Sequence, residues 1–580
     1  MGDILRYRFA LKLGLRAIGT VVATTALAAC GSGGESNGGP TGSAGTSGSA
    51  SGVSATGASA ASTGTTGAAG AETSGSANAG AGGAATASGV AGSSGSAGTS
   101  GSGTTTGANA GTSSGSDLDA SIAKTDASVV RDAGGAADAS TSHPADAGSG
   151  EGPLASGVMA FPAPGSKGVC PDPPLRLTFS APPTLGTAGK IQVFDAASSA
   201  NAVAVVDMGA TSFTDVIGGT TFNTVRPAFV DGNDAVIMLP SQALAYGHTY
   251  YVTIDSGAVI GPAGPLAVTD TATWRFTTAT AGPASVAALT VALGGSGDFC
   301  SVQGAIDAIP AKNTNADTIT IAPGIYHEII HFASKSNVTL LGEDRASTII
   351  EGTNNDDMNP STSTRSLVGI DSSSGVVVDT LTIHNLTPQG GSQAEALRME
   401  SCDKCIVRNS NIESLQDTLL WSGRIYASNC YIAGNVDFVW GTGAAYFDTC
   451  EIHTVGQAGA IVQARNPAST YGYVFVDSNI TADSTVKGQV LARIDVSQYP
   501  ASHVAYVNCT MTSAISPAGW TITGGTATSS LRFWEYESVD ANGNPIDVSQ
   551  RVTGSTQISS SVAASMRDAG TVLAGWQPSP

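Results

Sequence analysis

The stretch from Arg408 to Ile452 reads RNSNIESLQDTLLWSGRIYASNCYIAGNVDFVWGTGAAYFDTCEI, and one short pattern recurs in it. A polar residue, a small residue, any residue and an aliphatic residue follow one another. Copies of this pattern end at Ile412, Ile432, Ile452, Ile480 and Met511. Short strands repeated in this way, without helices between them, are typical of a solenoid in which each turn of chain stacks on the one before. The sequence therefore predicts a parallel β-helix.

The predicted solenoid spans about residues 285–577, and a single helix opens it. Ser301 can cap this helix and Pro310 ends it. The residues that would make one apolar face are Val302, Ala305, Ile306 and Ile309. We expect this helix to cover the amino-terminal end of the solenoid, where unpaired strand edges would otherwise invite aggregation.

Two aspartates become neighbours in this register. Asp417 and Asp437 each lie five residues past a repeat isoleucine, so stacking at ~4.8 Å places them side by side. Two like charges at ~5 Å repel by ~3 kcal/mol at an effective dielectric constant of ~20. That repulsion is worth about two pKa units, so one carboxyl group should keep its proton. An acid beside an ionised nucleophile or base suits ester or glycoside hydrolysis. The alternative is two solvated turn aspartates that never meet.

The same register brings two cysteines together. Cys430 and Cys450 lie at equal offsets from Ile432 and Ile452, and we expect a disulfide between them. A buried, reduced stack is the alternative. Cys402 and Cys405 form a C-x-x-C pair, but no second pair lies at zinc spacing. We expect a local disulfide or unpaired thiols there.

Five motifs in this region closely resemble signatures of the pectin methylesterases, the family-8 carbohydrate esterases. Their order along the chain is also the order of the family. They are Gly297-Asp-Phe299 with the helix after it, Gly324-Ile-Tyr-His-Glu328, Gln393-Ala-Glu-Ala-Leu397, Leu415-Gln-Asp-Thr-Leu419 and Gly434-Asn-Val-Asp-Phe-Val-Trp-Gly441. The resemblance implies a right-handed parallel β-helix whose substrate is pectin, that is, methylated homogalacturonan.

The resemblance also implies roles for single residues. Asp437 would be the nucleophile and Asp417 the general acid and then the general base. Gln393 and Gln416 would donate to the oxyanion, and Arg493 would hold Asp437 ionised and oriented. Because Gln416 and Asp417 are consecutive, both can reach one site only if the chain bends between them. No metal or other cofactor is expected.

Some positions near the predicted site depart from the family or allow two interpretations. Ile494-Asp495 stands where the family has Pro-Trp, which removes an aromatic and adds a carboxylate, and Leu420 replaces a common Tyr. Trp440 could stack on a sugar or pack within the β-helix. Gln463 and Arg465 resemble the family's "AQxR" segment and could contact substrate or be surface polar residues.

The amino-terminal region resembles a bacterial lipoprotein signal. Basic residues precede the apolar run Ala17–Ala29, which is too short for a membrane span. Residues 1–30 would form the signal region. Cys30 follows small residues and would be the lipidated residue, which becomes the first residue after cleavage. Residues 31–151 are rich in Gly, Ala, Ser and Thr and should form a disordered linker. We expect an exported lipoprotein at the outer membrane or cell surface, or else a secreted protein.

Residues 152–281 read as a separate all-β domain of short alternating runs bounded by Gly, Pro, Asn or Asp. Pro174–Ser180, Leu244–Ile254 and Thr273–Thr278 resemble conserved strands of bacterial Ig-like modules. The predicted fold class is thus all-β: a linker, an Ig-like β-sandwich and a parallel β-helix. We expect the sandwich to be a spacer, or else a module that contacts carbohydrate.

The charge of the chain excludes some functions. With 25 Lys and Arg against 45 Asp and Glu, the net charge is −20, and no basic cluster follows the first 16 residues, so nucleic-acid binding is not expected. A monomeric pectin methylesterase is the leading hypothesis. A deacetylase or thioester hydrolase on the same scaffold, or a polysaccharide-binding protein whose site has decayed, are the alternatives.

Overall fold

The computed structural model describes residues 150–154 and 156–579, and the structural statements below concern that part of the chain. The predicted signal peptide, Cys30 and nearly all of the predicted linker lie outside it. Among the described residues, no helix is both long enough and apolar enough to cross a membrane.

The first folded region is made of antiparallel sheets, as its alternating runs predict. One sheet has the order β1-β2-β3-β10-β9 and the other β12-β11-β5-β6, with β4 and β13 also paired to β11. Inward residues such as Val193, Val252 and Trp274 are almost fully buried and form the core. The strands are β1 Gly152–Pro153, β2 Met159–Phe161, β3 Leu175–Thr178, β4 Thr184–Leu185, β5 Lys190–Asp195, β6 Ala204–Asp207, β9 Ala228–Asp231, β10 Asp234–Ile237, β11 Thr249–Gly261, β12 Gly264–Val268 and β13 Arg275–Thr277.

A hairpin in this region was not predicted from the sequence. Strands β7 (Phe213–Ile217) and β8 (Thr220–Thr224) form a separate two-stranded sheet. Its buried residues Ile217 and Phe222 belong to the core of the following region, where the Phe222 ring lies 5.5 Å from that of His331. The hairpin therefore helps to cover that core.

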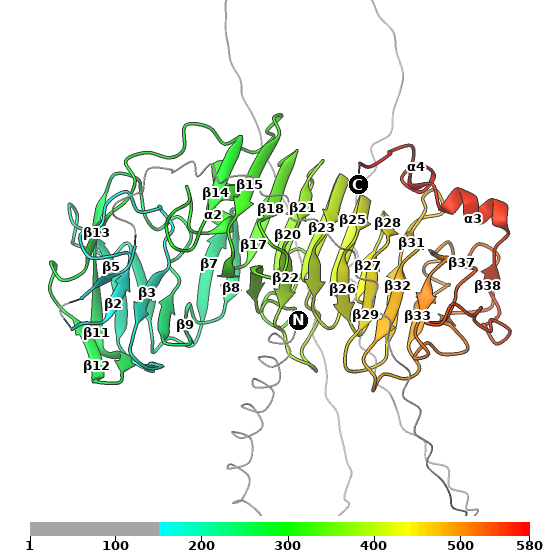
Figure 1. Ribbon diagram of the computed structural model, residues 1–580, viewed down its shortest axis with the longest axis horizontal. Helices are drawn as coiled ribbons and strands as arrows, with labels where there is room; N and C mark the ends of the chain where they lie inside the picture. Colours follow the sequence, from blue (N-terminus) through cyan, green and yellow to red (C-terminus); the bar gives the residue numbers. More distant parts are fainter. Residues whose placement is uncertain (1–149, 155, 580) are drawn as a thin grey trace, which may run out of the picture. The chain divides into compact units, whose positions relative to one another are not determined.

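The second folded region is a parallel β-helix, with one sheet of seventeen strands and one of eight. Figure 1 shows these strands succeeding one another in chain order from β14 to β38. The long strands β23 and β25 pair with different partners along their two halves, so the larger sheet turns a corner within them.

The larger sheet contains β14 Ala288–Val291, β15 Asp317–Ile321, β17 Ile330–Ala333, β18 Val338–Gly342, β20 Val368–Asp371, β21 Val377–Asp379, β23 Leu397–Arg408, β25 Leu419–Ser428, β27 Val439–Gly441, β28 Ala444–Asp448, β30 Ala460–Ala464, β31 Tyr473–Val476, β33 Val490–Asp495, β34 His503–Val507, β36 Trp520–Thr523, β37 Arg532–Tyr536 and β38 Ser555–Gln557. The smaller sheet contains β16 Gly324–His327, β19 Thr348–Gly352, β22 Thr382–Asn385, β24 Asn411–Glu413, β26 Tyr431–Gly434, β29 Glu451–Thr454, β32 Asn479–Ala482 and β35 Thr510–Met511.

The predicted register is confirmed along the whole repeat. The residues that pair in succession across the smaller sheet are Ile412, Ile432, Ile452, Ile480 and Met511. All five are buried, and each such side chain contributes about 1.5–3 kcal/mol of transfer free energy. Aromatic rings stack beside them, with Phe475 4.4 Å from Phe447 and 4.7 Å from Tyr506.

Helices close parts of the β-helix. The predicted opening helix is α2 (Val302–Ala308), which begins at Ser301, whose hydroxyl accepts from the Gly304 N–H. Its apolar face lies in the β-helix core, as expected. Near the carboxyl end, α3 (Ser560–Met566) and α4 (Ala569–Val572) pack on buried residues of the outer surface, including Tyr446 and Val474.

The two folded regions belong to one compact unit and are joined covalently. A disulfide links Cys170 to Cys300, 130 residues apart. Asp172 accepts from the N–H groups of Cys300 and Ser301 at 2.9 and 2.8 Å, and Glu328 accepts from those of Val302 and Gln303 at 2.8 and 2.9 Å. One carboxylate from each region thus satisfies backbone donors at the start of α2.

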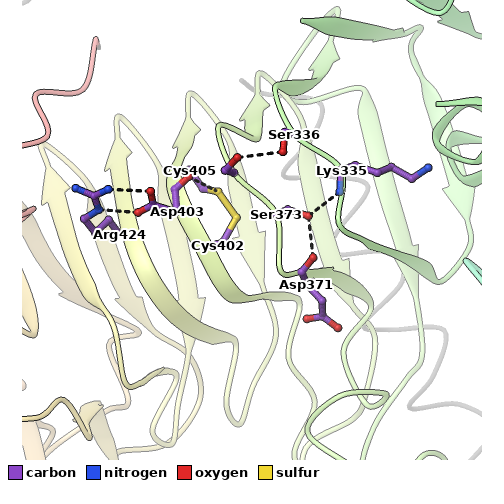
Figure 2. Close-up of a disulfide and its surroundings, with 9 residues drawn as sticks. Lys335, Ser336, Asp371, Ser373, Cys402, Asp403, Cys405 and Arg424 are labelled. Atoms are coloured by element: carbon purple, nitrogen blue, oxygen red, sulfur yellow. Dashed lines mark hydrogen bonds and ion pairs between the residues drawn. A yellow bond between two sulfur atoms is a disulfide. The ribbon is translucent and has the colours of Figure 1, made fainter. Parts of the chain in front are cut away.

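The predicted disulfide between Cys430 and Cys450 is wrong. Both residues are buried free thiols, as is Cys509. The register is as expected, but the thiols serve as donors to the backbone: Cys430 to the Ser428 carbonyl at 3.3 Å and Cys450 to the Asp448 carbonyl at 3.5 Å. The C-x-x-C pair does form a local disulfide. Figure 2 shows it beside the ion pair of Asp403 with Arg424.

Candidate active site

Asp417 and Asp437 come from two turns that stack on each other. Gln416 pairs with Val436 and Leu419 pairs with Val439, so the two aspartates occupy equivalent positions on neighbouring rungs. Both have a positive φ, 66° at Asp417 and 48° at Asp437, a conformation that aspartate tolerates better than most residues. The chain therefore bends at Asp417, directly after Gln416.

Arg493 holds Asp437 in a two-pronged ion pair. Arg493 lies in β33, and its Nε donates to Asp437 Oδ1 at 2.6 Å while its Nη2 donates to Oδ2. Asp437 is 5% exposed, whereas half of the Arg493 side chain is open to solvent. The hydrogen bond that Arg493 donates to Asp437 raises the pKa of Arg493. The predicted partnership is therefore present, and it fixes both oxygens of the carboxylate.

The two glutamines predicted as oxyanion donors lie on adjacent rungs. The Ala394 N–H donates to the Gln416 carbonyl at 3.1 Å, which places Gln393 and Gln416 beside each other along the stack. Both are partly buried. Within the described residues their side-chain amides make no hydrogen bond, so both N–H₂ groups are available to an incoming ligand.

Asp417 has a partner that the sequence did not indicate. Arg365 Nη2 donates to Asp417 Oδ2 at 3.0 Å and also to Glu395 Oε1 at 2.7 Å. Burial raises the pKa of Asp417 well above its usual range, and the negative charges of Glu395 and Asp437 act in the same direction. Arg365 and Arg465 oppose this effect. Asp417 is thus suited to keep a proton beside Asp437, whose two oxygens Arg493 holds.

Asp417 and Asp437 are called the dyad below. Polar side chains line the outer face of the sheet next to it. Trp440 pairs with Gln463 across β27 and β30, and Arg465 donates to the Gln463 side chain at 2.9 Å. The Arg465 guanidinium lies 4.7 Å from the Trp440 ring and 5.7 Å from that of Tyr499. Trp440 is only 8% exposed, so packing covers most of its ring. Contact of these three predicted residues with a substrate stays a prediction.

The unusual Asp495 is engaged within its own turn. Its side chain accepts from the Ser497 N–H at 2.9 Å and from the Gln498 amide at 3.1 Å. Its carbonyl accepts from the Tyr499 N–H at 2.9 Å. The hydrogen bonds from Ser497 and Gln498 lower the pKa of Asp495, led by that from the Ser497 hydroxyl. Asp495 therefore does not compete with Asp437 for Arg493. Its hydrogen bonds close the turn that carries the Tyr499 ring.

Each dyad carboxylate already pairs with a guanidinium group. Among the described residues, the cluster with metal-ligand spacing is Cys170, Asp172 and Cys300, and its two sulfurs form the disulfide between the folded regions. What the dyad can do is proton transfer and nucleophilic attack on a carbonyl group.

Sequence reasoning missed Arg365, Glu395 and Tyr499. Glu395 did carry a signal, because it is a charged residue inside the otherwise small and apolar run Ala394–Leu397. A carboxylate placed just before a buried strand needs a cation within reach. Nothing in the spacing pointed to Arg365, which lies thirty residues earlier and outside the regular repeat.

Comparison with protein families assigns both folded regions. Residues 288–572 match the "Pectinesterase" family and residues 156–278 match "Bacterial Ig-like domain". Alignments with two relatives from Arabidopsis thaliana cover most of the length of each relative. "Pectinesterase 31" is 31% identical over 42% of this chain and 79% of its own, and "Probable pectinesterase 56" is 34% identical over 40% and 84%.

A similar solved structure is "Pectin methylesterase from Carrot". It is 29% identical to this chain, with a TM-score of 0.45, and the alignment covers 50% of this chain and 93% of the carrot enzyme.

Proposed function

The chain belongs to the pectinesterase family and is a carboxylic ester hydrolase, and on that premise we propose that it removes methyl esters from the galacturonate residues of pectin. The observation that carries this proposal is the asymmetry of the dyad. Asp437 is paired with Arg493 through both oxygens, while Asp417 lies on the neighbouring rung and favours its protonated form.

We propose that Asp437 attacks the ester carbonyl carbon. The new C–O bond pushes the carbonyl electron pair onto oxygen, and the side-chain N–H₂ groups of Gln393 and Gln416 donate hydrogen bonds to that oxyanion. The intermediate collapses as the bond to the methoxy oxygen breaks. Asp417 gives its proton to the departing oxygen, so methanol leaves and an acyl-enzyme remains on Asp437.

The second half of the reaction reverses the role of Asp417. The carboxylate left after proton donation takes a proton from water, and the resulting hydroxide attacks the acyl carbon. The bond to Asp437 breaks, which releases galacturonate and restores Asp437 as a carboxylate held by Arg493. Asp417 ends the cycle protonated, as it began.

We propose that the polymer lies across the outer face formed by Trp440, Gln463 and Arg465. Gln463 and Arg465 are partly exposed and can donate to sugar hydroxyl groups, while Trp440 supports Arg465 from beneath. A highly methylated pectin carries little charge, so the net charge of −20 need not repel it. The Arg465 guanidinium can also pair with a galacturonate that has already lost its methyl group.

We also propose that the protein acts outside the cytoplasm. The support comes from the sequence: an n-region with Arg and Lys, the apolar run Ala17–Ala29, and Cys30 after small residues. Lipidation of Cys30 would anchor the enzyme to a bacterial membrane, and the long linker would carry it outward as a monomer. Metabolic labelling with a fatty-acid analogue, compared with Cys30→Ala, tests the anchor.

The proposed activity is tested by product identity. Purified protein is incubated with methylated pectin, with acetylated pectin and with a thioester, and methanol, acetate and thiol are measured. We expect methanol from the methylated polymer at a rate well above the other two products. Acetate as the main product would identify a deacetylase, and thiol as the main product would identify a thioester hydrolase. Binding of pectin without any product would indicate a decayed site.

A further inference from the structure

Arg365 connects three carboxylates around the dyad. Its Nη2 donates to Asp417 Oδ2 at 3.0 Å and to Glu395 Oε1 at 2.7 Å, so one nitrogen joins the two carboxyl groups. Its Nε donates to both Glu395 oxygens at 3.0 Å, and its Nη1 donates to Asp356 at 3.1 Å. The guanidinium is thus held on several sides while it touches Asp417.

Burial of the Glu395 carboxyl group in this position costs free energy. It is 0% exposed, and Arg365 is 7% exposed, so both charges are removed from water. A buried ion pair of this kind is weak evidence for stability, because apolar residues of similar volume often serve as well. A pair that contacts a reacting carboxyl group can instead serve the reaction.

The charges near Asp417 balance only if one acid carries a proton. Three guanidinium groups, those of Arg365, Arg465 and Arg493, act on the dyad. The carboxylates that face them besides Asp417 are Asp356, Glu395 and Asp437. Burial raises the pKa of Glu395 as well as that of Asp417. Arg365 makes three contacts to the two oxygens of Glu395 but only one to Asp417, so the geometry assigns the proton to Asp417.

We propose that Arg365 and Glu395 are a positioning pair for Asp417, in which Arg365 orients the carboxyl group and the negative charge of Glu395 keeps its proton in place for the leaving alcohol. This inference rests on the proposed function, in which Asp417 is the general acid. Two carboxyl groups that share one donor nitrogen lie within the roughly 4–6 Å over which one charge perturbs the other. The raised pKa of Asp417, which burial causes and Glu395 reinforces, agrees with this arrangement.

The two members of the pair have opposite effects on Asp417. Loss of Glu395 leaves the positive charge of Arg365 facing only Asp356 and Asp417, which favours the ionised form of Asp417. Loss of Arg365 leaves Glu395 with an uncompensated negative charge, which favours the protonated form. A pair that is only structural would not displace the two variants in opposite directions.

The experiment follows the Asp417 proton directly. The full chain is labelled with ¹³C at aspartate carboxyl groups and titrated by NMR, and the Asp417 signal is identified by its loss in Asp417→Asn. We expect Glu395→Gln to lower the pH midpoint of that signal by about one unit or more, and Arg365→Gln to raise it. An unchanged midpoint in both variants would overturn the proposal. This readout needs no substrate, so it is separate from the activity test.

The pH profile of kcat/KM for methanol release adds a second readout. The alkaline limb of Glu395→Gln should move to lower pH than in the wild type, and a parallel loss at all pH values would contradict the proposal. If a single variant does not fold, Arg365→Leu/Glu395→Leu decides the question. A folded double variant should lose kcat at least tenfold with little change in KM, and wild-type kcat in it would overturn the proposal. A wild-type protein that releases no methanol would contradict the proposed function instead.

Discussion

Asp417 and Asp437 occupy equivalent positions on neighbouring rungs, yet each is held by a different arginine. Arg493 binds both oxygens of Asp437 from a partly exposed position. Arg365 binds one oxygen of Asp417 and is itself committed to the buried Glu395. Two chemically identical residues in a repeating fold are thereby given different surroundings, and those of Asp417 favour its protonated form.

Arg493→Lys should lower kcat about tenfold to a hundredfold with little change in KM. A lysine keeps the positive charge but cannot donate to both Asp437 oxygens in the fixed geometry of a guanidinium group. The measurement is steady-state methanol release. Arg567→Lys is the matched control, because Arg567 makes a similar two-pronged pair with Asp477 away from the dyad. Equal kcat in Arg493→Lys and wild type would show that orientation of Asp437 is unimportant.

Thiol mapping should find three free cysteines among the described residues. Alkylation without a reductant should leave Cys430, Cys450 and Cys509 unmodified in the folded protein, because all three are buried, and modify them after unfolding. Peptides that contain Cys170 with Cys300, and Cys402 with Cys405, should separate only after reduction. Mass spectrometry of the peptides checks this. A linked Cys430–Cys450 peptide would contradict the structure.

Glu328 should make the folded protein less stable as the pH rises. Burial raises the pKa of Glu328 from 4.5 to about 7, so the folded state binds this proton more tightly than the unfolded state. The resulting stabilisation is complete below about pH 4.5 and is lost as the pH rises through about 7, which amounts to about 3 kcal/mol.

The variant Glu328→Gln isolates this contribution, since other buried acids also titrate. Urea unfolding from pH 4.5 to pH 8 should give a flatter dependence for Glu328→Gln than for the wild type. Glu343→Gln, at an exposed position in the same region, should follow the wild type. If the free energy of unfolding changed with pH in the same way for wild type and Glu328→Gln, the proposed contribution of Glu328 would be contradicted.

The rungs and the dyad were predictable because they repeat. Ile412, Ile432 and Ile452 are spaced by a constant length of chain, and in a stacked fold a constant length fixes which residues become neighbours. That logic found Asp417 and Asp437 and the adjacency of Cys430 and Cys450. It could not show whether two adjacent sulfurs are oxidised, since nearby carbonyl groups can also accept from thiols.

What escaped prediction comes from chain without a constant period. Arg365 belongs to the irregular segment before β20, so its approach to Asp417 depends on tertiary packing. The β7–β8 hairpin has short, mixed strands whose apolar residues, Ile217 and Phe222, pack on the β-helix instead of on their own domain. Local alternation does not reveal a partner that lies in another domain.

The dyad is tested most directly by methanol release from methylated pectin at saturation, with wild type, Asp437→Asn and Asp477→Asn side by side. Asp477 is a matched control, because it also has a positive φ, 49°, and a two-pronged arginine partner. We expect Asp437→Asn to lose at least about a thousandfold in kcat and Asp477→Asn to stay within about twofold of the wild type. An Asp437→Asn enzyme that releases methanol at the wild-type rate would contradict the assignment of Asp437 as the nucleophile.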